Sequence, residues 1–204
     1  MAEHTTYDST LPEPKEVPLI VTFVRHAQAA DSQFSGVSGS KLTELGRMQA
    51  ERLADRLAKE KFQHIYSSDL CRAYDTARQI SEHHEDTPFT VTPDIREITH
   101  FHFLPEPRPV QPITRKSLRR ERETVEKFAS HLRREHSPGE RILVVSHGNF
   151  IRTILPVLGG RDPRKVILVE FNNASVTIMD VWHNGEAVLK LANCVRHLPP
   201  GQIT

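Results

Sequence analysis

Two short apolar runs along the chain each end abruptly in polar residues that can carry chemistry. The first covers residues 19–24 and is followed by Arg25 and His26; the second covers residues 142–145 and is followed by Ser146 and His147. Continuous apolar runs of this length are typical of strands buried on both faces of an α/β sheet. Sites in such sheets lie beyond the carboxyl ends of the strands, so we expect both histidines at one sheet edge. Taken alone, an Arg-His pair is better explained as solvating a strand end.

The rest of the hydrophobic pattern alternates between helical and extended segments. A stripe of small and apolar residues after Thr43, a good N-cap, predicts a helix over residues 44–62. Asn184-Gly185 is a strong hairpin signal between two short strands. Three further helices are expected, over residues 70–83, over residues 113–136 and in the segment opened by Gly148. One further strand is expected to end near Ser67, and others are expected over residues 89–91, 166–171, 175–182 and 187–191.

This order of elements predicts a three-layer α/β/α sandwich with a mostly parallel mixed sheet and an antiparallel edge at its C-terminal end. Residues 1–18 are polar and carry three prolines, so we expect a poorly ordered tail there. Five prolines within residues 93–112 argue against regular structure in that stretch. No repeat or linker marks a second unit, and residues 19–198 are expected to form a single domain.

Charge and composition exclude several classes of partner. The 204 residues include 27 basic and 26 acidic side chains, so no overall field draws the protein to nucleic acid or an anionic membrane. The mixed-sign run at residues 115–123 is interpreted as a solvated helix face. No stretch approaches the ~20 apolar residues of a membrane span, and no signal peptide is visible. Two cysteines favour a reducing, cytoplasmic compartment.

Four segments, taken together and in order, resemble a known family. They are Arg25-His26-Ala27, Leu42-Thr-Glu-Leu-Gly-Arg-Met-Gln-Ala50, Ser67-Ser-Asp-Leu-Cys-Arg-Ala73 and Ser146-His147-Gly148. The chain resembles the histidine phosphatase superfamily in its phosphoglycerate-mutase-like branch. The likeness runs from about Leu19 to Leu198, and it implies a phosphoglycerate-mutase-like fold.

The residue types at these strand ends suit a phosphate monoester, which is a tetrahedral dianion. Arg25 and Arg72 each present a planar guanidinium that can take two phosphate oxygens. Helix N-termini after Ser68 and Gly148 would add backbone N–H groups, and a protonated His147 would add a charged donor. A neutral imidazole can also attack phosphorus to form a phosphohistidine, which water then hydrolyses.

The pattern alone does not say which imidazole attacks. The resemblance implies that His26 is the nucleophile and that His147 stabilises the transferring phosphoryl group. It also implies that Arg25 and Arg72 clamp that group. For the nucleophile's attacking nitrogen to keep a free lone pair, the other ring nitrogen must hold its proton, usually by bonding a backbone carbonyl.

The leaving alkoxide needs a proton, and the resemblance expects an acid after the strand at residues 89–91. Glu97 is the first choice, with Asp94 and Glu106 as alternatives, and a plain surface-loop glutamate is the competing interpretation. The acid-phosphatase branch instead has Asp directly after the second histidine, where this chain has Gly148.

Several positions depart from the family pattern. Ala27 stands where Gly is usual, Gln28 where Glu is common, and Ser32 near the place of a phosphate-binding Asn. Residues 99–103 replace a frequent Trp-Glu-Gly, which leaves substrate recognition open. The segment between the acid and residue 141 is short for a mutase, which usually carries a longer insertion there.

The densest histidine pairs among twelve are His83-His84 and His100-Phe-His102, and no Cys or carboxylate spacing completes a zinc set around them. We therefore expect no metal and no cofactor. His83 and His84 are expected on the surface, and His100 and His102 could line the mouth of the substrate site.

The sequence thus predicts an enzyme, a phosphoric monoester hydrolase of the histidine phosphatase kind. It would act without metal, through a phosphohistidine, on a small-molecule or protein phosphomonoester. A phosphoglycerate-type mutase and a non-catalytic member that binds a phosphorylated ligand are the alternatives. The physiological substrate and the oligomeric state stay open.

Overall fold

A computed structural model describes residues 17–30, 40–98, 115–163 and 169–204, with side chains described from residue 119 onward in the third range. Its core is a six-stranded sheet in the order β3-β2-β4-β1-β5-β6. The strands are β1 (Leu19–Arg25), β2 (His64–Ser68), β3 (Phe89–Thr92), β4 (Arg141–Ser146), β5 (Val176–Val181) and β6 (Ala187–Cys194). Strands β1 to β4 run parallel to one another, whereas β5 pairs antiparallel with both β1 and β6.

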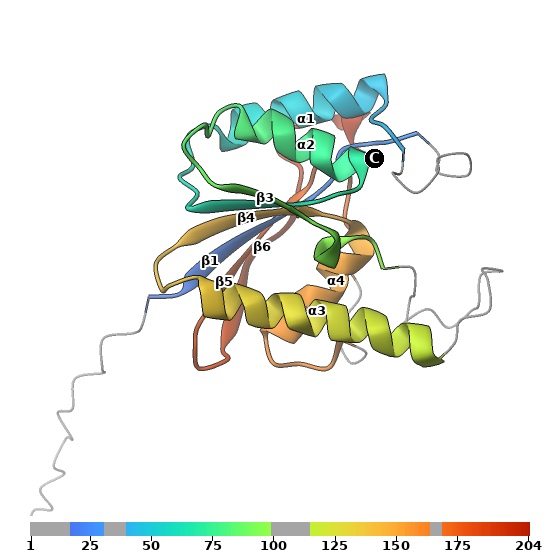
Figure 1. Cartoon of the computed structure of the whole chain (residues 1–204). Helices are drawn as coiled ribbons and strands as arrows, with labels where there is room; N and C mark the ends of the chain where they lie inside the picture. Colours follow the sequence, from blue (N-terminus) through green and yellow to red (C-terminus); the bar gives the residue numbers. More distant parts are fainter. Residues whose placement is uncertain (1–16, 31–39, 99–114, 164–168) are drawn as a thin grey trace, which may run out of the picture.

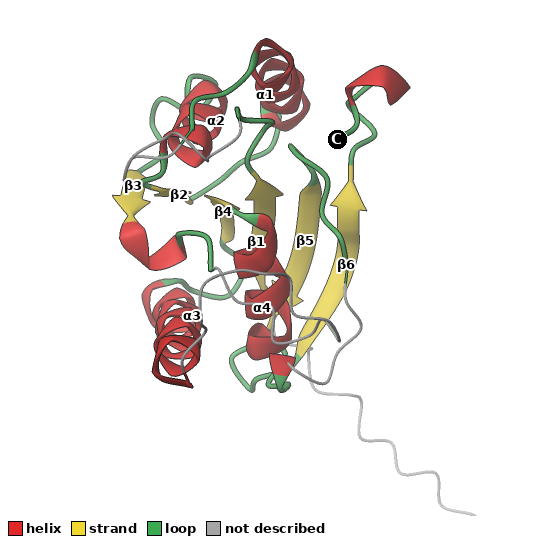
Figure 2. Cartoon of the chain, turned by 90° about the vertical axis from the view of Figure 1, so that its right-hand side faces the viewer, coloured by secondary structure: helices red, strands yellow, loops and turns green. Residues whose placement is uncertain are grey.

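Helices cover both faces of this sheet (Figures 1 and 2). Helices α1 (Glu44–Leu57) and α2 (Cys71–Ser81) lie on one face, and α3 (Arg115–Glu135) and α4 (Gly148–Leu158) lie on the other. Each pair of helices has its own apolar cluster against the sheet. The predicted three-layer α/β/α sandwich with a mostly parallel mixed sheet is confirmed.

The register of β1 and β4 explains why two distant histidines meet. Every residue of β1 from Val21 to Val24 is buried, as expected for a strand covered on both faces. Arg25 pairs with Ser146 across the two parallel strands. The residues that follow, His26 and His147, therefore leave the sheet side by side at its carboxyl edge.

The structure differs from the sequence prediction at several element boundaries. Helix α1 ends at Leu57 rather than residue 62, because a turn follows in which Glu60 N–H donates to Leu57 O. The expected strand at residues 166–171 is wrong where it is described, since residues 169–171 are not in a strand and residues 164–168 lie outside the described residues. Within the proline-rich stretch, Pro93–Ile95 forms a short 3₁₀ helix, η2, and residues 99–112 are not described.

The hairpin signal was correct, since β5 and β6 pair through a turn in which Gly185 has φ +92°. At the chain ends, residues 1–16 of the expected tail lie outside the described residues, and Pro18 O accepts the N–H of Gly139. Packing continues past Leu198, because Asn173 N–H donates to Thr204 O at 2.7 Å.

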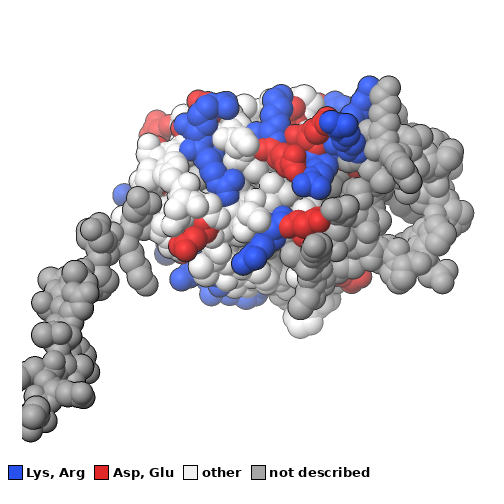
Figure 3. Space-filling model, turned by 90° about the horizontal axis from the view of Figure 1, so that it is seen from below, with Lys and Arg blue, Asp and Glu red and all other residues white. Residues whose placement is uncertain are grey.

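The outer surface near α3 mixes charges of both signs. Seen from below, Lys and Arg side chains are interspersed with Asp and Glu (Figure 3). On α3 itself, Arg119 pairs with Glu123 and Arg122 with Glu126, each four residues apart. This agrees with a solvated helix face. Within the described chain, the helices are all too short or too polar to cross a bilayer.

Candidate active site

His26 lies directly after β1 and is 7% exposed. Its Nδ1 is 2.8 Å from Ala27 O, a carbonyl that can only accept, so Nδ1 carries the ring proton. Arg72 Nε donates to Nε2 of His26 at 3.0 Å, so Nε2 holds the lone pair. Burial lowers the pKa of His26 to about 3, the hydrogen bond to Ala27 opposes this shift, and Arg72 and Arg25 add to it. The imidazole is therefore neutral, with its lone pair facing a guanidinium.

The backbone around His26 is fixed from several sides. Its N–H donates to Ser146 O at 2.9 Å, and its carbonyl accepts from Asn173 Nδ2 at 3.0 Å. The next N–H, of Ala27, donates to Thr76 Oγ1 at 3.1 Å. Because Thr76 is on α2 one turn after Arg72, the same helix holds the guanidinium and the backbone beside the imidazole.

Arg25 and Arg72 approach the imidazole from different elements. Arg25 is the last residue of β1, and Arg72 is the second residue of α2. Arg25 donates from Nη1 to Phe171 O, and its stem packs beside Gly148, where an added Cβ would lie 3.5 Å from Arg25 Nε. That buried Nε has no hydrogen-bond partner among the described residues. An anion between the two guanidiniums would supply one.

His147 is fully buried at the N-cap of α4, with its ring centroid 5.0 Å from that of His26. Burial lowers the pKa of His147 well below its usual value, and His26, Arg72 and Arg25 act in the same direction. Burial thus disfavours the charged donor that a protonated His147 would supply. Its Nε2 is 3.0 Å from Ser68 Oγ, and its buried Nδ1 has no partner within the described chain.

Glu97 follows η2 and reaches the N-terminus of α4. Its Oε1 accepts the N–H groups of Asn149 at 3.1 Å and Phe150 at 3.2 Å, and that of Ile98 at 3.1 Å. Burial raises the pKa of Glu97 to about 7, although the Phe150 N–H and the guanidiniums of Arg72 and Arg25 act against this shift. The backbone N–H groups at the start of α4 were candidates for binding a phosphate. Two of them, those of Asn149 and Phe150, instead donate to the Glu97 carboxylate.

The alternative acids differ from Glu97 in their surroundings. Asp94 lies on the surface, where Lys127 Nζ donates to its Oδ2 at 3.2 Å. Glu106 lies outside the described residues, as do Ser32, His100 and His102. Arg96, the residue before Glu97, is held in place because its guanidinium donates to both carboxylate oxygens of Asp69, at 2.7 and 2.5 Å. Of the two acids that the structure describes, Glu97 is therefore the one that interacts with Arg25 and Arg72.

Sequence reasoning gave no role to several buried polar residues around the site. Ser68 touches His147, and Asn173 touches His26, each from a segment more than 70 positions away. Gln49 accepts the N–H of Gln28 at 2.8 Å and donates to Gln202 O at 2.6 Å, which joins the loop after His26 to the end of the chain. The only local signal for such a role was that Ser68 is a small polar residue at a strand end.

One of the two histidine pairs considered for a metal, His83-His84, is described by the structure, and its two side chains lie in different surroundings. His83 is exposed, but His84 is buried against Phe62, with ring centroids 5.3 Å apart, so its expected surface position was wrong. Across the residues the structure describes, no group of three or more His, Cys, Asp or Glu side chains could hold a metal ion.

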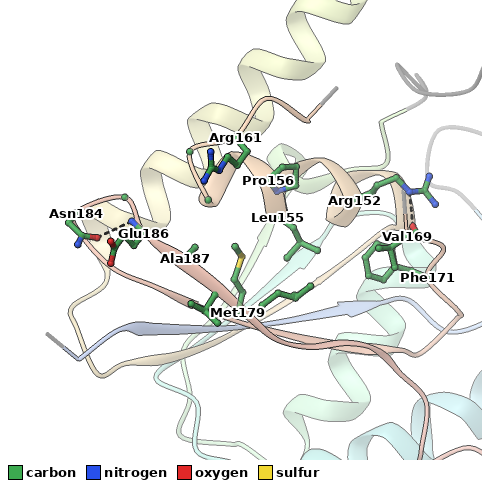
Figure 4. Close-up of a pocket in the computed structure, with 15 residues that line it drawn as sticks. Arg152, Leu155, Pro156, Arg161, Val169, Phe171, Met179, Asn184, Glu186 and Ala187 are labelled. Carbon is green, nitrogen blue, oxygen red and sulfur yellow. Dashed lines mark hydrogen bonds between the residues drawn. The ribbon is translucent and has the colours of Figure 1, made fainter. Parts of the chain in front are cut away.

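A hollow of about 970 Å³ lies between α4 and the β5–β6 hairpin (Figure 4). Its walls include Leu155, Met179 and Phe171, with Arg152 and Arg161 among them. Arg152 donates to Val169 O at 2.8 Å on this wall. None of His26, His147 or Glu97 lines it, so the hollow is distinct from the candidate active site.

Comparison with known proteins agrees with this arrangement. Phosphoglycerate mutase-like protein 4 of Arabidopsis thaliana is 28% identical over 204 residues, covering 87% of this chain and 86% of that protein. Phosphoserine phosphatase 1 of Hydrogenobacter thermophilus is 28% identical over 197 residues, covering 86% of this chain and 92% of that protein. The structure of mycobacterial glucosyl-3-phosphoglycerate phosphatase superposes with a TM-score of 0.67 at 22% identity, covering 86% of this chain and 98% of that one, which shows a shared fold.

The family model of the histidine phosphatase superfamily, branch 1, matches residues 21–104 and 99–194. These two stretches include both strand-end histidines, both arginines and Glu97. The chain therefore belongs to the histidine phosphatase superfamily (branch 1).

Proposed function

We propose that this protein is a phosphatase that hydrolyses a phosphomonoester through a phosphohistidine at His26. The single observation that carries this proposal is the state of the His26 ring. Its proton is fixed on Nδ1 by Ala27 O, and its Nε2 lone pair faces the Arg72 guanidinium. A neutral, oriented imidazole beside a phosphate-binding cation is what attack on phosphorus requires.

In the first step, Nε2 of His26 attacks phosphorus and the bond to the ester oxygen breaks. Arg25, Arg72 and His147 stabilise the charge on the transferring phosphoryl oxygens. The leaving oxygen takes its proton from Glu97. The pKa of Glu97, raised by burial to about 7, supports this role, because an acid is most effective when its pKa lies near the working pH.

In the second step, the carboxylate left on Glu97 takes a proton from water, and the resulting oxygen attacks phosphorus. The bond between Nε2 and phosphorus breaks, inorganic phosphate leaves, and Glu97 is again protonated. One residue thus serves as acid and then as base, as microscopic reversibility requires. No step needs a metal ion or a cofactor, because guanidinium groups carry the positive charge.

The names of relatives support a small phosphomonoester as substrate and also raise a rival. Phosphoserine is the substrate named for one relative, and a mutase-like protein is another. A mutase would return the phosphoryl group to an acceptor hydroxyl instead of water. Phosphoglycerate offered as substrate separates the two, since isomerisation faster than phosphate release would favour the mutase.

The test is to trap the intermediate. Protein mixed with ³²P-labelled phosphoserine or p-nitrophenyl phosphate and quenched in alkali should carry an acid-labile, alkali-stable label. His26→Ala should lose label and turnover together. His183→Ala, which changes an exposed histidine of the β5–β6 hairpin, is the matched control and should keep both. Turnover should survive excess EDTA, and label that persists in His26→Ala would overturn the assignment.

A further inference from the structure

His147 is held by a hydroxyl that the proposed reaction does not use. Ser68 is the last residue of β2, and its Oγ lies 3.0 Å from Nε2 of His147. Both side chains are completely buried. The backbone N–H of Leu70 also approaches Ser68 Oγ, at 3.4 Å, and can only donate to it. Ser68 therefore receives one hydrogen bond from the start of the turn into α2.

The hydrogen-bond inventory of this group distinguishes the two neutral forms of His147. If Nε2 carried the proton, it would donate to Ser68 Oγ. The Ser68 hydroxyl proton would then have no acceptor among the contacts described for it, and the lone pair on Nδ1 would also be unmet. If Nδ1 carries the proton, Ser68 donates to Nε2 and only the N–H of Nδ1 awaits a partner. Because unmet buried polar groups cost free energy, the second form is favoured.

We propose that Ser68 is a positioning residue that fixes His147 as the Nδ1–H form and so turns a neutral imidazole N–H toward a phosphoryl oxygen. The inference rests on the proposed function, since it assigns the ligand of that N–H to the phosphoryl group. An isolated neutral imidazole of histidine favours the opposite form, with the proton on Nε2. The Ser68 hydroxyl therefore has to reverse an intrinsic preference.

The charge of the ligand explains why this form matters. The other form would present the Nδ1 lone pair to a phosphate dianion, which repels it. An N–H at the same place donates a hydrogen bond without adding a formal charge beside Arg25 and Arg72. The Ser68 hydroxyl, which contacts His147 and not the substrate, thus decides whether His147 attracts or repels the substrate.

The first test needs no turnover. In protein labelled with ¹⁵N-histidine, long-range ¹H–¹⁵N spectra distinguish a protonated ring nitrogen from one with a lone pair, and His147→Asn identifies the signals of His147. We expect a protonated Nδ1 and an unprotonated Nε2 in the ligand-free protein. The reverse pattern at neutral pH would overturn the proposal outright.

The second test compares two neighbouring serines. Ser68→Ala should shift His147 toward the Nε2–H form and reduce both kcat and vanadate affinity by about 10- to 100-fold, as happens when an outer partner that orients an imidazole is removed. Ser67→Ala is the matched control. Ser67 is equally buried and donates to Ser68 O at 2.9 Å, but it does not touch His147. Equal effects of the two variants on the His147 spectrum would contradict the assignment.

These measurements distinguish failure of the proposed phosphatase function from failure of the positioning role proposed for Ser68. If the wild-type protein shows no phosphatase activity, the proposed function fails, while the tautomer and the binding of inorganic phosphate can still be followed by NMR. If activity is present but His147 keeps its form in Ser68→Ala, the proposed function stands and the role of Ser68 falls. If Ser68→Ala does not fold, the wild-type spectrum alone decides.

Discussion

Arg72 Nε and His26 Nε2 are 3.0 Å apart, and the N–H of the guanidinium points at the lone pair of the imidazole. This bond occupies the atom that attacks phosphorus in the proposed reaction. A bound phosphoryl group would draw the Arg72 N–H groups to its own oxygens and release the lone pair. Under the proposed mechanism, the contact holds His26 in its reactive form and yields when substrate arrives.

From this contact we expect Arg72→Ala to lower kcat by about 10² to 10³, as removal of one preorganised donor does in other enzymes. Arg72→Lys should lose less, although an ammonium cannot restore the two-point contact with phosphate. Steady-state kinetics on p-nitrophenyl phosphate would measure both.

Arg78→Ala is the matched control for Arg72, because Arg78 lies on the same helix and donates to Glu82 at the surface. It should leave kcat unchanged. If Arg72→Ala and Arg78→Ala had the same activity, Arg72 would have no part in the reaction.

A second prediction concerns Gly46 in the first turn of α1. A Cβ built there would lie 1.9 Å from the backbone oxygen of Gln28, two residues after His26. Gly46→Ala must therefore push the loop that follows His26, and we expect a loss of about 1–3 kcal/mol or more in the free energy of unfolding. Urea denaturation measures this loss, and kcat should fall with it.

Gly201→Ala provides the comparison for Gly46, since a Cβ at residue 201 would meet nothing within 4 Å. It should leave both stability and kcat near wild type. A Gly46→Ala protein as stable as Gly201→Ala would mean that the loop after His26 adapts freely.

The sequence predicted the fold well because its strongest signals are local. The apolar run of β1 and its abrupt end at Arg25 sufficed to place a buried strand and a polar strand end. Likewise, the side chain of Thr43 accepts the N–H of Gly46 as an N-cap should. Such features depend on residues a few positions apart, so they can be read without knowing the tertiary structure.

What the sequence did not predict depends on distant partners. Residues 169–171 include the β-branched Val169 and the aromatic Phe171, which favour a strand. Their carbonyls instead accept hydrogen bonds from the side chains of Arg152 and Arg25, and not from the backbone of a neighbouring strand. Ser68 gains its contact with His147 only because β2 and β4 lie side by side. No periodicity records such contacts, which is why the two arginines and two histidines were expected at the site but their supports were not.

A third prediction concerns stability at low pH. Tyr66 Oη bonds His131 Nε2 at 3.3 Å and His136 Nε2 at 2.9 Å, and the His64 ring stacks on Tyr66, with Glu135 and Glu140 nearby. Burial lowers the pKa of His64 and of His131 below the usual value of 6.5. The unfolded state therefore binds more protons than the folded state once the pH falls below about 6.5, and the protein should lose stability there.

The share of His131 in this acid sensitivity can be measured. A glutamine at this position can still bond Tyr66 but cannot take up a proton, so His131→Gln should show a smaller fall in Tm between pH 7.5 and 5.5. His183→Gln, at an exposed position, should follow the wild-type curve. Parallel curves for all three proteins would show that His131 titrates alike in both states.

The fourth prediction concerns Glu97 as the general acid. A positioned acid is worth about 10² to 10⁴ in rate, and its value depends on how badly the leaving group needs a proton. Phosphoserine releases a basic alkoxide, whereas p-nitrophenyl phosphate releases a stable phenolate. Glu97→Gln should therefore cripple hydrolysis of phosphoserine, or of another alkyl phosphate that the protein accepts, and affect the aryl ester far less.

The pH dependence gives an independent measure of the same group. The acid must be protonated to act, and burial raises the pKa of Glu97 to about 7. When the first step limits the rate, kcat on the alkyl ester should fall as the pH rises through about 7. This fall should be absent in Glu97→Gln, whose amide does not titrate.

Two features of the structure make the Glu97 comparison clean. The amide oxygen of Glu97→Gln can still accept the N–H groups of Asn149 and Phe150 that hold the carboxylate now, so the start of α4 should keep its support. Asp94→Asn removes a nearby acid whose described partner is the exposed Lys127, and it should leave the ratio of alkyl to aryl rates unchanged. If Glu97→Gln lowered both rates by the same factor, Glu97 would support α4 without donating the proton, and Glu106 would become the acid to test.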